Sequence, residues 1–115
     1  MRLNVIGTTT VDGRISANGL NGGYDTTTQS GAGHVTYRFW AGGGGSGGSI
    51  YLDTATLSGA GSIATAGGTV GNYKAGGGAG GRIFINSNSD TFTGTVNAAG
   101  GWGWQTGGAG TVVRQ

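Results

Sequence analysis

The chain has 115 residues, of which 30 are glycine, and it contains neither proline nor cysteine. Collagen is excluded because it needs a strict three-residue glycine period with abundant proline, and a chain without cysteine has no disulfide framework and no thiolate metal site. The formal net charge is +2, with the basic residues spread along the chain, which is a poor electrostatic footprint for nucleic acid. No apolar run approaches the roughly 18 residues that a membrane span needs.

The distribution of the apolar residues argues against disorder. Glycine-rich segments lose much conformational entropy on folding, which favours an unfolded chain. Here, however, only 9% of the residues are charged, and the apolar residues fall into short alternating runs. Alternation with a period of two is typical of a strand with one buried face. We therefore expect a folded, all-β chain.

Three segments repeat one pattern in the same order. Each begins with an alternating apolar pair, continues through a single large apolar residue and a glycine, and ends in a second alternating pair that leads to a glycine-rich tract. The pairs that begin the segments are Leu3/Val5, Ile50/Leu52 and Ile83/Ile85. A fourth segment begins at Val112.

The spacing of these segments predicts the size of the repeating unit. Ile83 follows Ile50 by 33 positions, and Val112 follows Ile83 by 29. Ile50 follows Leu3 by 47 positions, which predicts an insertion in the first connection. We expect a single domain over 1–115, with units over about 2–48, 49–81 and 82–110 and a partial unit over 111–115.

Repeats of this length cannot bury an apolar face alone, so they gain a core by stacking on their neighbours. The sequence therefore predicts a parallel β-helix, or β-solenoid, of about three to four irregular coils joined by glycine-rich connections. The predicted columns of stacked residues are Leu3/Ile50/Ile83/Val112, Val5/Leu52/Ile85, Val11/Leu57/Phe92 and Ile15/Ile63/Val96. An antiparallel β-sandwich is the alternative, because it also has short alternating strands.

Three glycine-rich tracts, over 41–48, 75–81 and 107–110, each lead directly into a predicted strand. Polyglycine can adopt extended left-handed helices of polyproline-II type, which have no internal hydrogen bonds. Because glycine has no Cβ atom, such segments can lie side by side and bond to one another through their backbones. The tracts are therefore interpreted as ordered connections rather than random linkers.

The pattern GGGGSGGSIYL…LSGAGSIATAGG…GGGAGGRIFI…FTGTVNAAGG resembles the glycine-rich repeat regions of large bacterial surface and secreted β-helix proteins. The tracts are also similar to the packed polyglycine segments of certain phage adhesins and receptor glycine-rich domains. Those segments are longer, whereas the tracts here are short and separated by strands. The resemblance implies an extracellular stalk or adhesive module and no specific ligand.

The titratable residues do not form a catalytic pattern. The four aspartates, Asp12, Asp25, Asp53 and Asp90, fall in different columns, whereas acid–base catalysis needs two such groups close together. His34 is the only histidine, and no nucleophile and orienting acid surround it in a recognisable motif. The glycine tracts also lack the G-x-x-x-x-G-K-[S/T] formula of a P-loop. We therefore expect no enzymatic activity, no metal and no cofactor.

Aromatic residues in the connections are the candidate ligand contacts. If the connections project from one side of the fold, their rings gather on one face, where aromatic planes beside amide side chains suit a sugar ring. The alternative is that the rings pack over the glycine tracts as a second small core. The candidate contacts are Trp102, Trp104, Gln105, Tyr73 and Trp40.

Paired threonines give a minor alternative function. The threonines at 8–10, 26–28, 54–56 and 91–95 are similar to the Thr-x-Thr ladders of ice-binding solenoids. An ice-binding surface needs regular columns of threonine, and these pairs do not fall in one predicted column. β-propensity and turn chemistry account for the threonines as well.

Together these features predict a non-catalytic structural or adhesive repeat module of an extracellular or cell-surface protein. A carbohydrate-binding module that uses the aromatic connections is the alternative, and an ice-binding solenoid is the minor one. Terminal repeats of a solenoid expose strand edges, so we expect other copies or flanking repeats of the same protein as partners. Glycans are further candidate partners, whereas nucleic acid and a membrane span are not expected.

Overall fold

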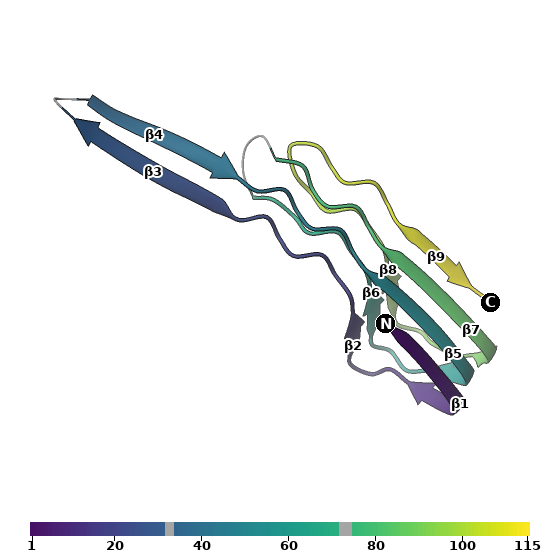
Figure 1. Cartoon of the computed structure of the whole chain (residues 1–115). Coiled ribbons are helices and arrows are strands. Elements are labelled where there is room, and N and C mark those ends of the chain that lie inside the picture. The colour runs from purple at the N-terminus through teal and green to yellow at the C-terminus, as the bar shows by residue number, and fades with distance from the viewer. Residues whose placement is uncertain (32–33, 72–74) are drawn as a thin grey trace.

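The computed structural model describes the backbone of residues 1–31, 34–71 and 75–115, and the side chains of 1–23, 41–71 and 75–115. Within these residues the fold is all-β and has no helix (Figure 1). Its strands are β1 (Arg2–Thr10), β2 (Arg14–Ser16), β3 (Tyr24–Gly31), β4 (His34–Ala41), β5 (Ser49–Ser58), β6 (Ser62–Ala64), β7 (Arg82–Asp90), β8 (Thr95–Asn97) and β9 (Thr111–Arg114).

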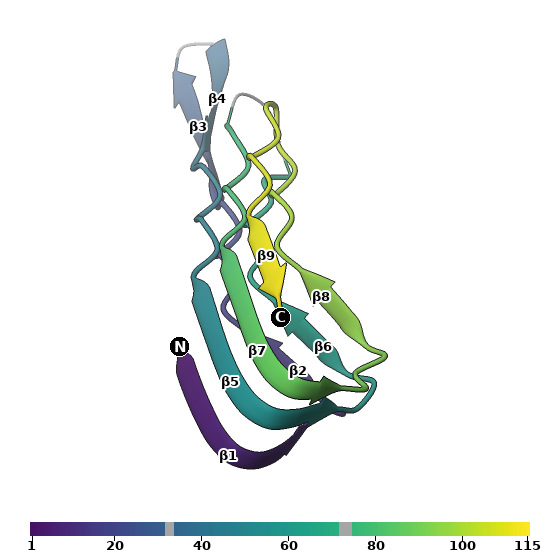
Figure 2. The same cartoon turned by 90° about the vertical axis from the view of Figure 1, so that its right-hand side faces the viewer.

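Seven of these strands form two parallel sheets. The larger sheet has the order β1-β5-β7-β9, and the smaller has the order β2-β6-β8. Figure 2 shows the chain turning from the larger sheet into the smaller one in each repeat. The antiparallel sandwich was therefore a wrong alternative, because equivalent strands are joined by long excursions that favour parallel pairing. The two sheets do not close around the core, so the solenoid stays a prediction.

The core lies between the two parallel sheets. It is built from the inward positions of the alternating strands, which have a period of two. Leu52, Leu57 and Ile63 have no exposed surface, and Ile83 and Ile85 are equally buried. The buried cluster is completed by Val11, Ile50, Phe92 and Ala98.

The strand register confirms one predicted column in full and parts of two others. Ile50, Ile83 and Val112 are register partners, as are Leu52 and Ile85, and Ile15, Ile63 and Val96 form the matching column of the smaller sheet. Val11, Leu57 and Phe92 share the buried cluster, but Leu57 pairs with Thr9 and Asp90 instead.

The predicted column position of the first repeat was wrong by two residues. Leu3 pairs with Leu52, and Val5 pairs with Thr54. A shift of two keeps an inward residue inward, so the hydrophobic pattern alone cannot distinguish these registers. A bulge between Val5 and Thr8 in β1 changes the offset once more.

The predicted insertion in the first connection is confirmed as the hairpin β3–β4. The two strands pair antiparallel, from Tyr24 opposite Ala41 to Gly31 opposite His34. Figure 1 shows the hairpin extending beyond the glycine tracts, at the opposite end of the molecule from the parallel sheets. The molecule is long and narrow, with principal extents of 71 × 22 × 21 Å.

The glycine-rich tracts form an ordered array between the sheets and the hairpin. Six tracts make two layers, one leaving the smaller sheet and one entering the larger sheet. The outgoing tracts are 17–23, 65–71 and 98–103, and the returning tracts are 42–48, 75–81 and 104–110.

Backbone hydrogen bonds join the array in two directions. Within a layer, neighbouring tracts run parallel, so that Gly44 donates to Gly76 and Gly47 donates to Ala79. Between layers the tracts run antiparallel, and every third residue of 42–48 donates to the tract 17–23. These bonds run from Gly42, Gly45 and Gly48 to the carbonyls of Gly23, Leu20 and Ala17. A period of three is that of a polyproline-II-type helix.

One chain of hydrogen bonds crosses all six tracts at the same level. Each N–H in this relay donates to the carbonyl of the previous member, over distances of 2.7 to 2.9 Å. The pairs are Gly45 to Leu20, Gly68 to Gly45, Gly78 to Gly68, Gly101 to Gly78 and Gly107 to Gly101. A Cβ atom on Gly78 would lie 1.9 Å from the Gly45 carbonyl oxygen, so the close approach requires glycine.

Candidate functional site

The turn at 102–105, where the tract 98–103 passes into 104–110, carries three of the predicted contact residues, Trp102, Trp104 and Gln105. Three backbone hydrogen bonds hold it: Val70 N–H donates to the Trp102 carbonyl at 2.8 Å, Trp104 N–H donates to Ala75 at 3.0 Å, and Gly77 N–H donates to Gln105 at 2.8 Å. The backbone beneath the indole rings is therefore fixed by the neighbouring tracts.

Trp102 and Trp104 project from this turn into solvent. Their exposed fractions are 64% and 73%, so the alternative of a second small core over the glycine tracts is wrong for these two side chains. Gly103 separates them, and a Cβ atom there would lie 2.5 Å from the backbone nitrogen of Gly77. The turn can rest on the neighbouring tract only because this residue is glycine.

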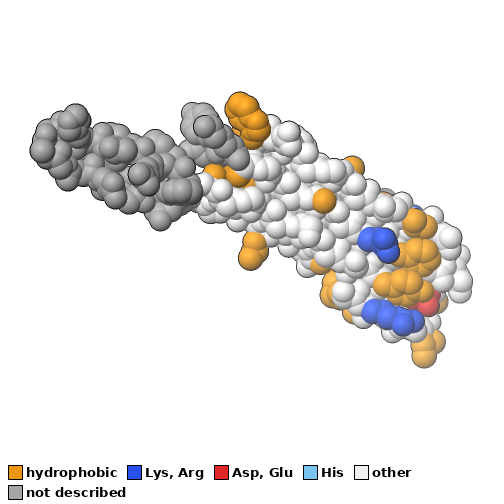
Figure 3. Space-filling view, turned by 45° about the horizontal axis from the view of Figure 1, so that its top comes forward, with side chains coloured by type: hydrophobic (Ala, Val, Ile, Leu, Met, Phe, Trp, Pro, Cys, Tyr) orange, Lys and Arg blue, Asp and Glu red, His pale blue; other side chains and the backbone are white. Residues whose placement is uncertain are grey.

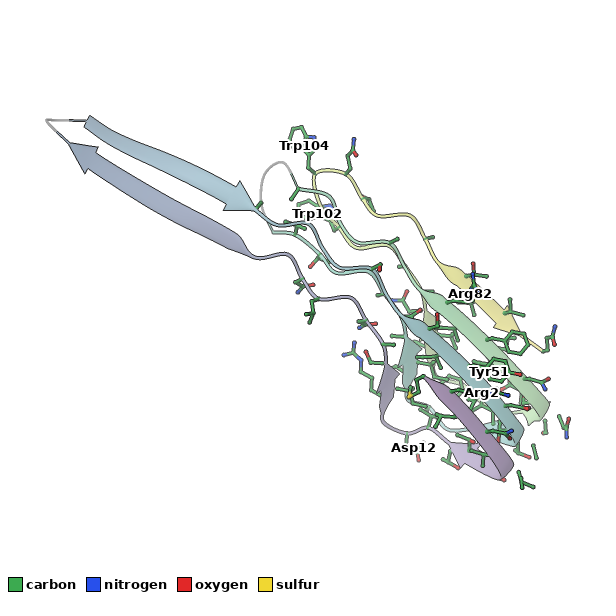
Figure 4. The ribbon with its side chains drawn as sticks, viewed as in Figure 1. Arg2, Asp12, Tyr51, Arg82, Trp102 and Trp104 are labelled. Carbon is green, nitrogen blue, oxygen red and sulfur yellow. The ribbon has the colours of Figure 1, made fainter. Side chains whose placement is uncertain are left out.

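The remaining predicted contacts are placed as follows. Gln105 is exposed beside the two tryptophans. Tyr73 and the side chain of Trp40 lie outside the described residues, although the backbone of Trp40 pairs with Asp25 in the hairpin. Figure 4 shows Trp102 and Trp104 far from Tyr51 and Arg2, which lie on the larger sheet. The structure thus gathers three of the five candidates at one turn.

Sequence reasoning missed a row of side chains on the outer face of the larger sheet. Arg2, Tyr51, Phe84 and Val113 are successive register partners across the four strands. The Tyr51 and Phe84 rings are stacked, with centroids 5.0 Å apart and planes at 8°, and the Arg2 guanidinium lies 5.1 Å from the Tyr51 centroid. The sequence contained a signal for this row, because Tyr51 and Phe84 each stand between the two inward residues of a repeated apolar pair.

This row is poorly suited to stacking on a sugar. One face of the Tyr51 ring is occupied by Arg2 and the other by Phe84. Phe84 in turn has Val113 as its register partner on β9. A sugar ring needs a free aromatic face, and both faces of the Tyr51 ring are occupied. Figure 3 shows hydrophobic side chains flanked by basic ones at the sheet end of the molecule. We interpret the row as a ladder that fixes the register of the sheet.

The aspartates with described side chains lie apart from one another in the fold. Asp53 accepts a hydrogen bond of 3.0 Å from Asn86 on the neighbouring strand, and Asp12 accepts one of 3.4 Å from the backbone N–H of Ala60. Asp90 forms a bidentate ion pair with Arg114. Among the described residues, no group of three or more His, Cys, Asp or Glu side chains is placed to hold a metal ion.

The Asp90–Arg114 pair lies against Phe92 of the buried cluster. The Arg114 side chain donates to both carboxylate oxygens, at 2.5 and 2.7 Å, and to the Phe92 carbonyl at 3.1 Å. Its guanidinium lies 5.6 Å from the centroid of the Phe92 ring. The hydrogen bonds from Arg114 lower the pKa of Asp90 below its usual value, because they stabilise the carboxylate form.

The threonines of the larger sheet are partly brought into register. Thr8 pairs with Thr56, and Thr56 pairs with Ser89, so one row of hydroxyl-bearing residues does exist, contrary to the sequence alignment. In a neighbouring row the Thr10 hydroxyl bonds to the Ser58 hydroxyl at 3.0 Å. The rows mix threonine with serine, and this is not the regular threonine array that an ice-binding surface needs.

Within the part of the chain that the structure describes, no helix is long and apolar enough to cross a membrane. Comparison with known protein families, with curated proteins and with solved structures finds no match to this chain.

Proposed function

We propose that this chain is a non-catalytic structural and adhesive module of an extracellular or cell-surface protein, built on a short β-solenoid. The observation that carries the proposal is the relay of backbone hydrogen bonds that joins all six glycine tracts. Isolated glycine-rich linkers are flexible. Here every tract is bonded to its neighbours, which supports a stiff arm rather than a tether.

The separation of the hairpin from the parallel sheets supports the role of an arm. Both termini lie in the half of the molecule that holds the parallel sheets, whereas the hairpin β3–β4 lies at the opposite end (Figure 1). The sheets and their buried core serve as the base. The glycine array holds the turn at 102–105 and the hairpin away from this base.

Spin-label distances test the stiffness of the arm. The chain has no cysteine, so Ser49→Cys at the base and Gln105→Cys at the tip, both exposed positions, can be labelled specifically. We expect a narrow distance distribution by double electron–electron resonance. The same pair in denaturant is the control, and a broad distribution in buffer contradicts the proposal.

Carbohydrate binding is the second candidate function, favoured by the exposure of the two tryptophans. Each indole extends from a backbone that is held by neighbouring tracts. Little backbone conformational entropy is therefore lost when a ligand stacks on it. Aromatic planes and the neighbouring Gln105 amide suit the C–H faces and hydroxyl edges of a sugar. This candidate assigns the adhesive role to the turn at 102–105.

A glycan array tests this second candidate. We expect binding to at least one glycan class and its loss in Trp102→Ala and Trp104→Ala. Leu20→Ala is the matched control, because Leu20 is 84% exposed on a different tract. Absence of binding by the unmodified chain, or equal binding by all variants, eliminates carbohydrate recognition at this turn.

A further inference from the structure

Two Asn-Gly steps lie in the first outgoing tract, at 18–19 and 21–22, and the sequence contains no other. Asparagine is a thermolabile residue, and its amide is most reactive when glycine follows. Glycine has no side chain to hinder its own backbone nitrogen when this nitrogen attacks the preceding amide. Both asparagine side chains are exposed to water. The tract 17–23 therefore carries the reactive groups of a modification site.

In the folded chain, each step is bonded to one residue of the second repeat. In the step 18–19, the asparagine side-chain oxygen accepts from the Ala66 N–H at 2.8 Å, and the glycine N–H donates to the Ala66 carbonyl at 2.8 Å. In the step 21–22, the asparagine oxygen accepts from the Thr69 N–H at 2.9 Å and from the Thr69 hydroxyl at 3.2 Å. The glycine N–H of this step donates to the Thr69 carbonyl at 3.0 Å.

These bonds occupy both groups that deamidation needs. Ring closure requires the glycine nitrogen to lose its proton and to approach the Cγ atom of the preceding asparagine. Here the N–H is held by a carbonyl of the second repeat, and the amide is held by an N–H of the same residue. The backbone also has little room to rotate, because a Cβ atom on Gly19 or Gly22 would lie 1.9 or 2.0 Å from a carbonyl oxygen of the tract 42–48. The closed array therefore suppresses the reaction.

The tract 17–23 is placed to open before the rest of the array. It forms the edge of the outgoing layer and, among the described tracts of that layer, pairs only with 65–71 (Figure 1). Six backbone hydrogen bonds hold it, of which three are donated to 64–69 and three are accepted from 42–48. Local opening of an edge element costs less free energy than global unfolding. Opening releases both Asn-Gly steps at once.

We propose that the two Asn-Gly steps are a self-modification site that reacts when the tract 17–23 opens and then keeps the first repeat open. In the open tract the glycine nitrogen forms a bond to the asparagine Cγ, the bond from Cγ to the amide nitrogen breaks, and ammonia leaves. Water then opens the cyclic imide at either of its two carbonyls, which gives aspartate or isoaspartate. Water is the only other reactant.

The two products differ in their effect on the array. Aspartate leaves the main chain unchanged, and its carboxylate accepts the same hydrogen bond from Ala66 or Thr69. Isoaspartate routes the main chain through Cβ and so lengthens the tract by one carbon atom. The three-residue period that aligns 17–23 with 42–48 is then lost beyond the modified position. An isoaspartyl tract therefore cannot close again.

Mass spectrometry of protein aged in mildly alkaline buffer tests the protection. Residues 15–38 form one tryptic peptide that contains both steps, and each conversion adds one mass unit. We expect conversion at Asn18 and Asn21 to be at least tenfold slower in the folded chain than in concentrated guanidinium chloride, because the reaction needs the open tract. Equal rates in the two conditions overturn the proposal.

Two matched variants test whether this tract controls the rate. In Gly68→Ala the new Cβ would lie 1.9 Å from the Leu20 carbonyl oxygen, which pushes the first two outgoing tracts apart. Gly101→Ala makes the equivalent clash one repeat later, 1.9 Å from the Gly68 oxygen. We expect Gly68→Ala to approach the rate in denaturant and Gly101→Ala to keep the slow rate, with both folds checked by circular dichroism. Equal rates in folded variants contradict control by this tract.

Hydrogen exchange tests whether the modification keeps the tract open. Chains aged in denaturant are refolded, and the peptide isomers that cover 17–23 are separated by chromatography before their exchange is measured. We expect isoaspartyl chains to exchange these amides as an unstructured chain does. The combined variant Asn18→Asp, Asn21→Asp is the control and should stay protected. Isoaspartyl chains as protected as this control overturn the locking step. None of these results depends on the adhesive role.

Discussion

The rings of Tyr51 and Phe84 lie stacked on neighbouring strands, 5.0 Å between centroids and 8° from parallel. They occupy the same position in two successive repeats, so the repetition of the chain brings like side chains into contact across the sheet. Cross-strand aromatic pairs of this kind stabilise a sheet beyond the area that they bury.

We predict that this pair couples measurably in unfolding experiments. Tyr51→Ala and Phe84→Ala should each destabilise the fold, and a double-mutant cycle should give a coupling free energy of about 0.5–1.5 kcal/mol. Chemical denaturation of the four proteins measures it. A cycle between Tyr51→Ala and Ser89→Ala, which lie apart on the sheet, should be additive, and additivity in the aromatic cycle contradicts the stacking.

Alanine substitution should destabilise the fold at interior glycines and leave its stability nearly unchanged at surface glycines. In Gly78→Ala the new Cβ would lie 1.9 Å from a backbone oxygen, so a loss of about 3 kcal/mol or more in the free energy of unfolding is expected. Gly108→Ala has nothing within 4 Å and should be neutral or stabilising by about 0.5 kcal/mol. Thermal unfolding by circular dichroism compares them; similar melting temperatures argue against the array.

The hairpin should be removable without loss of the rest of the fold. Gly42 N–H donates to the Gly23 carbonyl at 2.8 Å, so the two tracts already meet at the base of β3–β4. Replacing 24–41 with an Asn-Gly turn should leave a folded chain whose melting temperature changes by a few degrees. Proton–nitrogen NMR spectra should keep the signals of the two parallel sheets, and a general collapse of these signals contradicts this prediction.

The Asp90–Arg114 pair predicts a change of stability in acid. Because the folded protein lowers the pKa of Asp90, the pair stabilises the fold above the carboxyl's unfolded pKa of about 4. This stability is lost as the pH falls below about 4, through the lower pKa of the folded state. The pair is partly exposed, so we expect no more than about 1 kcal/mol. In urea unfolding experiments, the free energy of unfolding of Arg114→Val should change less between pH 5 and pH 2 than that of the unmodified protein.

Much of the fold follows from the sequence because its repeats alternate clearly. The apolar pairs beginning at Ile50 and Ile83 gave the correct strands and register, and the long first spacing gave the insertion. The register of Leu3 did not follow, because a shift of two residues leaves the hydrophobic pattern unchanged. For the glycine tracts, the sequence indicated only that polyglycine segments can bond to one another through their backbones. It did not predict which tracts pair, because backbone hydrogen bonds do not depend on the identity of side chains.

The candidate site was less predictable than the fold. Trp102 and Trp104 were singled out for lying in a connection, but their exposure depends on the bonds of Ala75 and Val70 to the same turn. The ladder of Tyr51 and Phe84 was overlooked although the two residues align in the repeats. Attention to outward positions of equivalent strands, and not to connections alone, would have found it.

The three-residue period of the glycine array sets a unit of length for this architecture. Adding a single residue to one tract would rotate its remaining N–H groups away from their acceptors, whereas adding one full turn to each of the six tracts preserves every bond. A polyproline-II turn advances about 9 Å. An arm built this way grows or shortens in whole steps, through coordinated changes in all tracts, while the turns at its tip vary without disturbing the lattice beneath them.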